Sequence, residues 1–195
     1  MKKIGLTGGI GSGKTYISNI FKSLGIPLFN SDIEAKILMN SSKKLISQIK
    51  KEFGEDIYTN ENFNKEKLSS IVFSNSDKLQ KLNSLVHPIV KEEFDNWCKK
   101  QTSPYVIKEA AILFESNSHL GLDAVICVSA PLELRMERLL KRDNSSEKEI
   151  KKRIENQISQ EEKENLSDYI IVNDEKDLLL PQIIKIHEKL INPFI

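Results

Sequence analysis

The residues best suited to chemistry lie near the N-terminus, where residues 8–15 fit the pattern Gly-x-x-x-x-Gly-Lys-Thr. Glycines let a backbone curl until several N–H groups point at phosphate oxygens, and a helix that starts near Gly13 adds the positive end of its dipole. In this pattern Lys14 reaches the β- and γ-phosphates, and the Thr15 hydroxyl ligates Mg²⁺. The sequence therefore predicts a site for the phosphates of ATP that consists of Gly8, Gly9, Gly11, Ser12, Gly13, Lys14, Thr15 and Tyr16.

The elements around this loop must hold it at the edge of a sheet. An apolar strand is expected at residues 4–7, and residues 17–24 then carry apolar side chains at helical spacing. A second strand is expected at residues 26–29, which completes a parallel strand–helix–strand unit. A glycine turn without a ligand is the alternative. The preceding strand and the following amphipathic helix favour a phosphate loop instead.

Nucleotide binding alone does not define a reaction, and other side chains distinguish a kinase from a guanine-nucleotide switch. The chain lacks the Asn-Lys-x-Asp pattern of guanine-nucleotide switches. A kinase needs a carboxylate that accepts the proton of the attacking hydroxyl, and cations that follow the moving charge. Asp32, just after the second expected strand, is the candidate base, although a helix N-cap is an alternative role. Arg138 and Arg142 share a helix face and are the candidate phosphate clamp, whereas arginines on polar helices are more often solvated.

Composition excludes several classes of protein. The chain has 195 residues, of which 39% are hydrophobic and 29% are charged, and its formal net charge is +1. This balance is typical of a globular protein and gives no electrostatic reason to expect a nucleic-acid partner. Cys98 and Cys127 are far apart and the histidines are scattered, so we expect reduced thiols and no metal cluster. No apolar run approaches the roughly 20 residues of a membrane span. We expect a cytoplasmic monomer that binds neither nucleic acid nor membrane.

The rest of the chain alternates between helical and strand patterns. Residues 33–100 are expected to be helical throughout, with one helix that starts at Ser76 and another that Pro88 opens. Ser146 and Ser159 each precede a glutamate by three residues, as in capping boxes, within a polar segment that is typical of a lid. Further strands are expected at 105–107, extending toward Phe114, at 124–128 and at 169–172, with a final helix at 176–190. The pattern predicts an α/β fold with a parallel sheet of about five strands, flanked by helices and interrupted by a helical insert.

Several short motifs follow one another along nearly the whole chain. In order they are residues 4–14 around the loop, Asn30-Ser31-Asp32, Leu85-Val86-His87-Pro88-Ile89, Ile112-Leu113-Phe114-Glu115, residues 138–143 and residues 168–173. Together they resemble the dephospho-CoA kinase family, which phosphorylates the ribose 3′-hydroxyl of dephospho-CoA in the last step of coenzyme A biosynthesis. The chain departs from that family at Asn30, where the family has aspartate, at Ala111, where proline is frequent, and at Arg135, where glutamine is usual.

The resemblance implies ATP as phosphoryl donor, Mg²⁺, dephospho-CoA as acceptor and a single P-loop kinase domain. Within it, the resemblance implies a core of residues 1–32, 104–137 and 166–195, a helical CoA-binding subdomain of residues 33–103, and a lid of residues 138–165. Other kinases of nucleoside monophosphates or small metabolites remain the rival, as does a nucleotide-binding regulatory module without turnover.

The resemblance also assigns roles to residues. Asp32 is expected as the general base, with Lys14 and Arg138 as further catalytic residues. His87, Phe114 and Glu115 are expected beside the acceptor, Arg142 beside the ATP phosphates, and Asn173 on the adenine side. For His87 there is an equal alternative: a histidine at the start of a helix that bonds to a nearby carbonyl.

Overall fold

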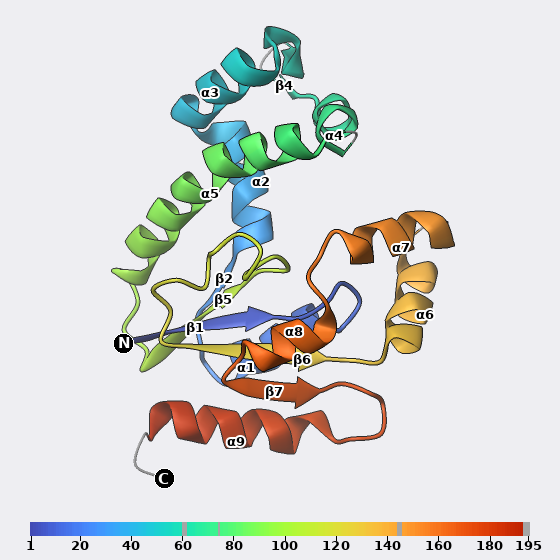
Figure 1. The fold of residues 1–195 in the computed structure, drawn as a ribbon. Helices are drawn as coiled ribbons and strands as arrows, with labels where there is room; N and C mark the ends of the chain where they lie inside the picture. Colours follow the sequence, from blue (N-terminus) through green and yellow to red (C-terminus); the bar gives the residue numbers. More distant parts are fainter. Residues whose placement is uncertain (60–61, 74, 144–145, 193–195) are drawn as a thin grey trace. The chain divides into compact units, whose positions relative to one another are not determined.

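The chain forms two compact units in the computed structural model, which describes residues 1–59, 62–73, 75–143 and 146–192. One unit consists of Met1–Asn30 and Gln101–Ile195, and the other of Ser31–Lys100. Figure 1 shows the first unit built around a sheet and the second built mainly from helices.

The first unit contains a five-stranded sheet. Its strands lie in the order β2-β5-β1-β6-β7, and every neighbouring pair is parallel. The strands are β1 (Lys2–Thr7), β2 (Leu28–Asn30), β5 (Tyr105–Glu109), β6 (Ala124–Ser129) and β7 (Tyr169–Val172). The predicted five-stranded parallel sheet is therefore confirmed. Because the strands are parallel, their carboxyl ends meet at one edge, where open α/β sheets bind ligands.

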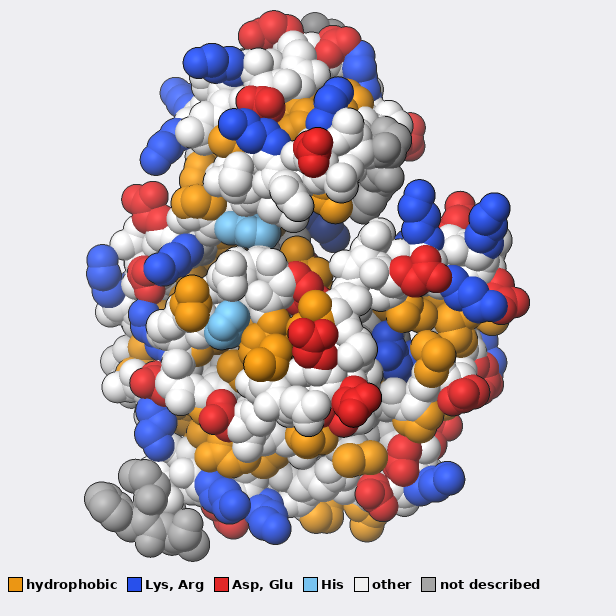
Figure 2. All heavy atoms as spheres, viewed as in Figure 1, with side chains coloured by type: hydrophobic (Ala, Val, Ile, Leu, Met, Phe, Trp, Pro, Cys, Tyr) orange, Lys and Arg blue, Asp and Glu red, His pale blue; other side chains and the backbone are white. Residues whose placement is uncertain are grey.

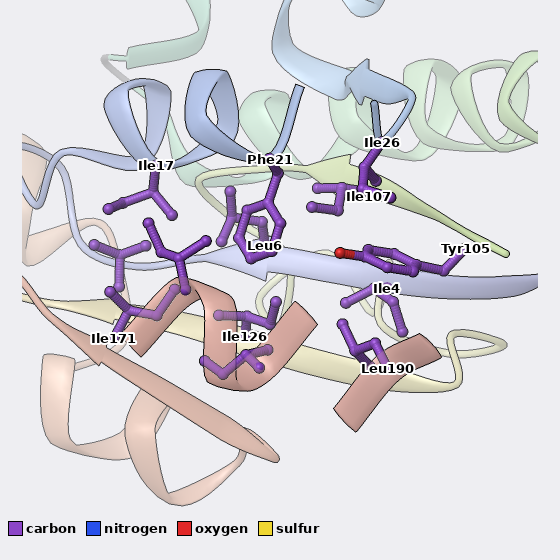
Figure 3. Close-up of a cluster of buried hydrophobic side chains, with 13 residues drawn as sticks. Ile4, Leu6, Ile17, Phe21, Ile26, Tyr105, Ile107, Ile126, Ile171 and Leu190 are labelled. Atoms are coloured by element: carbon purple, nitrogen blue, oxygen red, sulfur yellow. The ribbon is translucent and has the colours of Figure 1, made fainter. Parts of the chain in front are cut away.

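Both faces of this sheet are covered. On one face, α1 (Lys14–Ser23) and α9 (Leu179–Ile191) pack on the strands, and Figure 3 shows Phe21 of α1 beside Leu6 of β1. On the other face a smaller cluster forms, which includes Leu113 and Val125, and a Cβ added at Gly5 would meet both of their side chains. Alternate residues of β1 thus point to opposite layers, as in any strand buried on both faces.

Three further helices follow β6. They are α6 (Leu132–Arg142), α7 (Glu147–Glu155) and α8 (Gln160–Asn165). Ser146 forms the predicted capping box with Glu149 at the start of α7. Ser159 accepts a hydrogen bond from the Glu162 backbone N–H at 3.0 Å and thereby caps α8. The helix ends that sequence patterns indicated are thus stabilised by local side-chain bonds.

The second unit differs from its expected all-helical pattern in one place. It contains α2 (Ser31–Ser41), α3 (Lys43–Phe53), the short 3₁₀ helix η1 (Glu55–Ile57), α4 (Lys65–Phe73) and α5 (Ser76–Cys98). Between η1 and α4, the antiparallel strands β3 (Tyr58–Thr59) and β4 (Asn62–Phe63) form a hairpin. Two-residue strands are too short to show an alternating pattern in sequence, which explains the wrong prediction.

Two other predicted boundaries are wrong. Pro88 does not open a helix, because it lies inside α5, which is 23 residues long and continues past it to Cys98. Proline removes one helical hydrogen bond, but Val86 and Val90 are buried on either side of it, and their burial holds the helix together. The strand at residues 105–107 ends at Glu109 instead of extending toward Phe114, because turns follow it.

The surface carries charges of both signs. Figure 2 shows lysines and arginines interspersed with aspartates and glutamates on the face that it displays, which accords with the formal net charge of +1. Within the described ranges, no helix combines the length and apolar character that crossing a membrane requires. The same ranges contain no cluster of His, Cys, Asp and Glu that could hold a metal ion by itself.

Candidate active site

The phosphate loop, residues 8–15, connects the carboxyl end of β1 to α1. Gly8, Gly11 and Gly13 have φ angles of 146°, 83° and 94°, a region that favours glycine. A Cβ at Gly8 would lie 2.4 Å from the backbone oxygen of Val128, so the loop also lies too close to β6 for a side chain there. Gly13 is the N-cap of α1 and offers no side-chain cap. The N–H groups of Tyr16 and Ile17 donate to the Gly13 backbone oxygen at 3.0 and 3.2 Å, and the positive end of the α1 dipole at this point favours an anion.

Lys14 folds back over the loop. Its Nζ donates to the backbone oxygens of Gly8 and Gly9, at 2.9 and 3.1 Å. These two bonds hold the ammonium group against the backbone of Gly8 and Gly9. A lysine in this position can move a short distance to a phosphate oxygen, which is a stronger acceptor because it carries charge.

An acidic side chain lies beside Thr15. The Thr15 hydroxyl contacts Oε1 of Glu109, the last residue of β5, at 3.5 Å. Glu109 is 4% exposed, and its Oε2 has no hydrogen-bond partner among the described residues. A buried carboxylate oxygen without a partner is costly unless a cation or donor reaches it. A hydroxyl and a carboxylate are oxygen ligands of the kind that Mg²⁺ prefers, so this pair fits that ion.

Arg138 and Asn173 meet at the other side of the loop. Asn173 is buried, and its Nδ2 donates to the Ser12 backbone oxygen at 2.8 Å. The Arg138 Nη2 donates to the Asn173 side chain at 3.3 Å and to Glu175 at 3.0 Å. The buried Nη1 of Arg138 has no partner in the part of the chain that the structure describes, and it lies 3.9 Å from the Cβ position of Gly13. The structure thus brings a guanidinium donor to the start of α1.

The other predicted side chains of this unit lie elsewhere. Arg142 is 64% exposed and pairs with Asp143 at the end of α6, which raises the pKa of the guanidinium and lowers that of Asp143. Tyr16 is exposed on α1. Phe114 is buried in the smaller core cluster, where its ring packs on His119. Glu115 accepts from the Lys163 Nζ at 2.7 Å. Within the described part of the chain, the ion pairs of Arg142 and Glu115 are thus made with Asp143 and Lys163, outside the phosphate loop.

Asp32 and His87 belong to the helical unit. Helix α2 begins at Ser31, so Asp32 lies inside its first turn with an exposed side chain and is not its N-cap. His87 is half-buried in the middle of α5, so it does not start a helix there. The helix N-cap position that the sequence left open for Asp32 and the helix-start position that it left open for His87 are therefore both wrong.

Sequence reasoning missed several residues around the loop. Glu109 could have been suspected, because it is a carboxylate at the carboxyl end of a strand. Arg135 was identified only as a departure, yet it is 4% exposed and its Nε donates to the Ile10 backbone oxygen at 2.9 Å. Gln157 and Gln160 accept from the Ile10 and Gly9 backbone N–H groups, both at 3.0 Å. Glutamines in a polar segment carry no sequence signal for such contacts.

Comparisons with known proteins agree on one family. The family model described as dephospho-CoA kinase matches residues 2–178. A dephospho-CoA kinase of Bacteroides fragilis strain YCH46 is 37% identical over 185 residues, which cover 94% of this chain and 90% of that protein. One from Porphyromonas gingivalis is 38% identical over 192 residues, with 96% and 94% covered.

Solved structures agree on the fold. A Thermus thermophilus crystal structure aligns with a TM-score of 0.84 and 26% identity, covering 100% of this chain and 98% of that one. The dephospho-CoA kinase of Campylobacter jejuni aligns with a TM-score of 0.70 and 24% identity, covering 100% of both chains. A shikimate kinase of Acinetobacter baumannii shares the fold at a TM-score of 0.57 and 15% identity, covering 100% of this chain and 96% of that one. Because the family model spans most of the chain and the relatives exceed a third identity over most of its length, the chain belongs to the dephospho-CoA kinase family, the kinases of the last step in coenzyme A biosynthesis.

Proposed function

We propose that this chain transfers the γ-phosphoryl group of ATP to the ribose 3′-hydroxyl of dephospho-CoA at the phosphate loop. The observation that carries the proposal is the convergence of the loop, Lys14 and the unpartnered Nη1 of Arg138 at the start of α1. In the reaction the 3′-oxygen bonds to the γ-phosphorus as the bond from that phosphorus to the bridging oxygen breaks. CoA and ADP are the products.

The loop and the two cations bind and orient the donor. The N–H groups at the start of α1 bind phosphate oxygens, and Lys14 follows the charge that moves toward the bridging oxygen. Arg138 donates through Nη1, while Asn173 and Glu175 hold its other nitrogen in place. In such preorganised sites, loss of one charged donor lowers turnover by roughly 10²- to 10³-fold.

Thr15 and Glu109 are the residues that would hold Mg²⁺. Their contact at 3.5 Å and the free Oε2 of Glu109 support this assignment. When bound, the ion supplies positive charge that offsets the phosphate oxygens. Glu109 would contribute a carboxylate ligand beside the Thr15 hydroxyl.

Asp32 is proposed as the general base. It lies two residues after β2 ends, in the first turn of α2, and its side chain is exposed and able to accept a proton. The 3′-hydroxyl gives its proton to this carboxylate as it attacks the γ-phosphorus. His87, Phe114 and Glu115 at the acceptor, Arg142 and Tyr16 at the donor, and a monomer in the cytoplasm stay predictions of the sequence.

A coupled assay of ADP release tests the proposal. ADP should form only when both ATP and dephospho-CoA are present, and no nucleoside monophosphate should replace the latter. Asp32→Asn should lower kcat by roughly 10²- to 10⁴-fold while the Kd for ATP stays unchanged, because only the proton acceptor is lost.

Asp77→Asn is the matched control, since Asp77 also lies exposed in the first turn of a helix in the same unit. It should keep the full rate. An Asp32→Asn enzyme with undiminished kcat would exclude Asp32 as the base. Transfer to a nucleoside monophosphate without transfer to dephospho-CoA would exclude the acceptor.

A further inference from the structure

The first residues of the phosphate loop are held from outside by side chains. The Gly9 backbone N–H donates to Oε1 of Gln160 at 3.0 Å, and the Ile10 N–H donates to Oε1 of Gln157 at 3.0 Å. The Ile10 backbone oxygen accepts from Nε of Arg135 at 2.9 Å. We call Arg135, Gln157 and Gln160 the loop brace. Three backbone groups of Gly9 and Ile10 are thus fixed by side chains from two different segments.

Gln160 ties the loop to the sheet as well. While its Oε1 accepts from Gly9, its Nε2 shares two N–H donors among three acceptors, which are Glu164 at 2.9 Å, the sulfur of Cys127 at 3.3 Å and the Val128 backbone oxygen at 3.4 Å. Val128 is the residue whose oxygen lies closest to the Cβ position of Gly8. One amide group therefore joins the start of the loop to the end of β6, in a fixed orientation.

The segment that carries the two glutamines is itself anchored. Lys163 is fully buried, and its Nζ donates to Glu115 at 2.7 Å and to the Ala111 backbone oxygen at 2.9 Å. Glu115 also accepts from the Ile158 backbone N–H at 3.2 Å. Residues 157–163 are consequently attached to the segment after β5, which fixes the distance from the glutamines to the loop.

Arg135 closes the brace from α6. Its guanidinium lies against Gly9, since a Cβ there would come within 2.4 Å of the Arg135 Cζ. The side chain is 4% exposed, and in the described ranges no carboxylate forms an ion pair with it. A buried, unpaired guanidinium adds positive potential behind the loop, and such a charge is relieved when an anion binds nearby.

We propose that the loop brace positions the phosphate loop for nucleotide binding, with Gln157 and Gln160 as its positioning residues. The N–H groups of Gly9 and Ile10 are used to hold the loop, while those at the start of α1 face the phosphates. This role rests on the proposed use of the loop as an ATP phosphate site. It adds that residues 157–160, in a segment the sequence presents as a polar lid, are structural supports of that site.

Amide hydrogen exchange of the nucleotide-free chain tests the brace directly. Gln157→Met keeps the side-chain length and removes the acceptor, so the Ile10 amide should exchange about 5- to 10-fold faster. Gln157→Glu keeps an acceptor oxygen and should restore the slow exchange. Gln182→Met is the matched control, because Gln182 also accepts from a backbone N–H, that of Val172 at 2.8 Å. It should speed exchange at Val172 and leave the loop unchanged.

Calorimetric titration with ATP and steady-state kinetics test the positioning role. Gln157→Met should raise the Kd for ATP by about 3- to 10-fold and leave the KM for dephospho-CoA unchanged, whereas Gln182→Met should change neither. Unaltered exchange at Ile10 in Gln157→Met would refute the brace. Faster exchange with an unaltered Kd for ATP would refute its role in positioning. If the unmodified chain released no ADP with dephospho-CoA, the proposed function would fail while the exchange result still stood.

Discussion

Lys163 offers the sharpest test of how the first unit is held together. Its side chain is fully buried, and its Nζ lies 2.7 Å from Glu115, whose side chain is 17% exposed. Lys163→Met removes the ammonium group but fills nearly the same volume. In this variant the Glu115 carboxylate keeps its hydrogen bond from the Ile158 backbone N–H. The Ala111 backbone oxygen loses the hydrogen bond that it accepts from the Lys163 Nζ. The replacement should therefore destabilise the fold through an uncompensated charge.

The expected magnitude follows from the burial of the pair. Breaking a buried ion pair by removing one partner costs about 3–5 kcal/mol, and the lower end applies because Glu115 can still reach some water. For a chain of this length, the average entropy of unfolding converts about 3 kcal/mol into a decrease in Tm of about 7 °C. Thermal unfolding followed by far-ultraviolet circular dichroism measures that shift.

Two controls separate the charge from simple loss of contact. The double variant Lys163→Met/Glu115→Gln removes both charges, so it should recover most of the lost Tm. Lys151→Met breaks an exposed pair with Glu147 in α7, at 2.7 Å, and should leave Tm close to that of the unmodified chain. A Tm for Lys163→Met within about 1 °C of the unmodified chain would refute the reasoning. A double variant as unstable as the single one would also refute it.

Two further predictions concern glycine and tyrosine. Gly8→Ala should abolish ATP binding or destabilise the fold by about 2 kcal/mol or more, because its Cβ would lie 2.4 Å from the Val128 oxygen. Gly25→Ala is the control, because Gly25 has a φ of 81° but no atom lies within 4 Å of its Cβ position, so the replacement should cost only backbone strain. Urea unfolding and ATP titration measure both variants. Equal losses of stability and of ATP affinity in the two variants would contradict the steric argument. Burial raises the pKa of Tyr58 to about 12 from an ordinary value near 10. The unfolded chain therefore loses the Tyr58 proton at lower pH than the folded chain. The contribution of the buried, neutral Tyr58 to the free energy of unfolding is full below about pH 10 and is lost as the pH rises toward 12. Urea unfolding across this range should show that decline in the unmodified chain and a weaker one in Tyr58→Phe, and equal slopes would contradict it.

The parts of the fold that sequence predicted are those that local patterns determine. The phosphate loop depends on glycines at fixed spacing, and three of them adopt the positive φ angles that such a loop requires. The capping box at Ser146 is likewise local, since its partner Glu149 is three residues away. Parallel strands were predictable from short apolar runs separated by helices. In each case the signal and the structure lie within a few residues of each other.

The parts that sequence did not predict depend on distant partners. Lys163 lies in a polar segment of the kind that is usually exposed to solvent. Its burial is possible because Glu115, 48 residues earlier, neutralises the charge of its ammonium group. Arg135 is buried because Ile10 offers a carbonyl 125 residues away. At Pro88 the local signal was present but gave the wrong prediction. Proline usually ends or opens a helix, whereas here the packing of the neighbouring side chains keeps α5 continuous. No pattern within a window of sequence contains these pairings.

The contacts around Lys14 explain why a loop of this kind needs support from outside. A phosphate that displaces the Gly8 and Gly9 oxygens from the Lys14 Nζ replaces two neutral acceptors with a charged one. The exchange is favourable, because a bond between the ammonium group and a charged phosphate oxygen is stronger than a bond between the same group and a neutral carbonyl oxygen. It nevertheless removes two bonds that keep the loop curled. The bond from the Gly9 N–H to Gln160 does not involve Lys14, so it persists during the exchange. The loop can therefore give up its lysine to the nucleotide without losing the curvature that binds the phosphates.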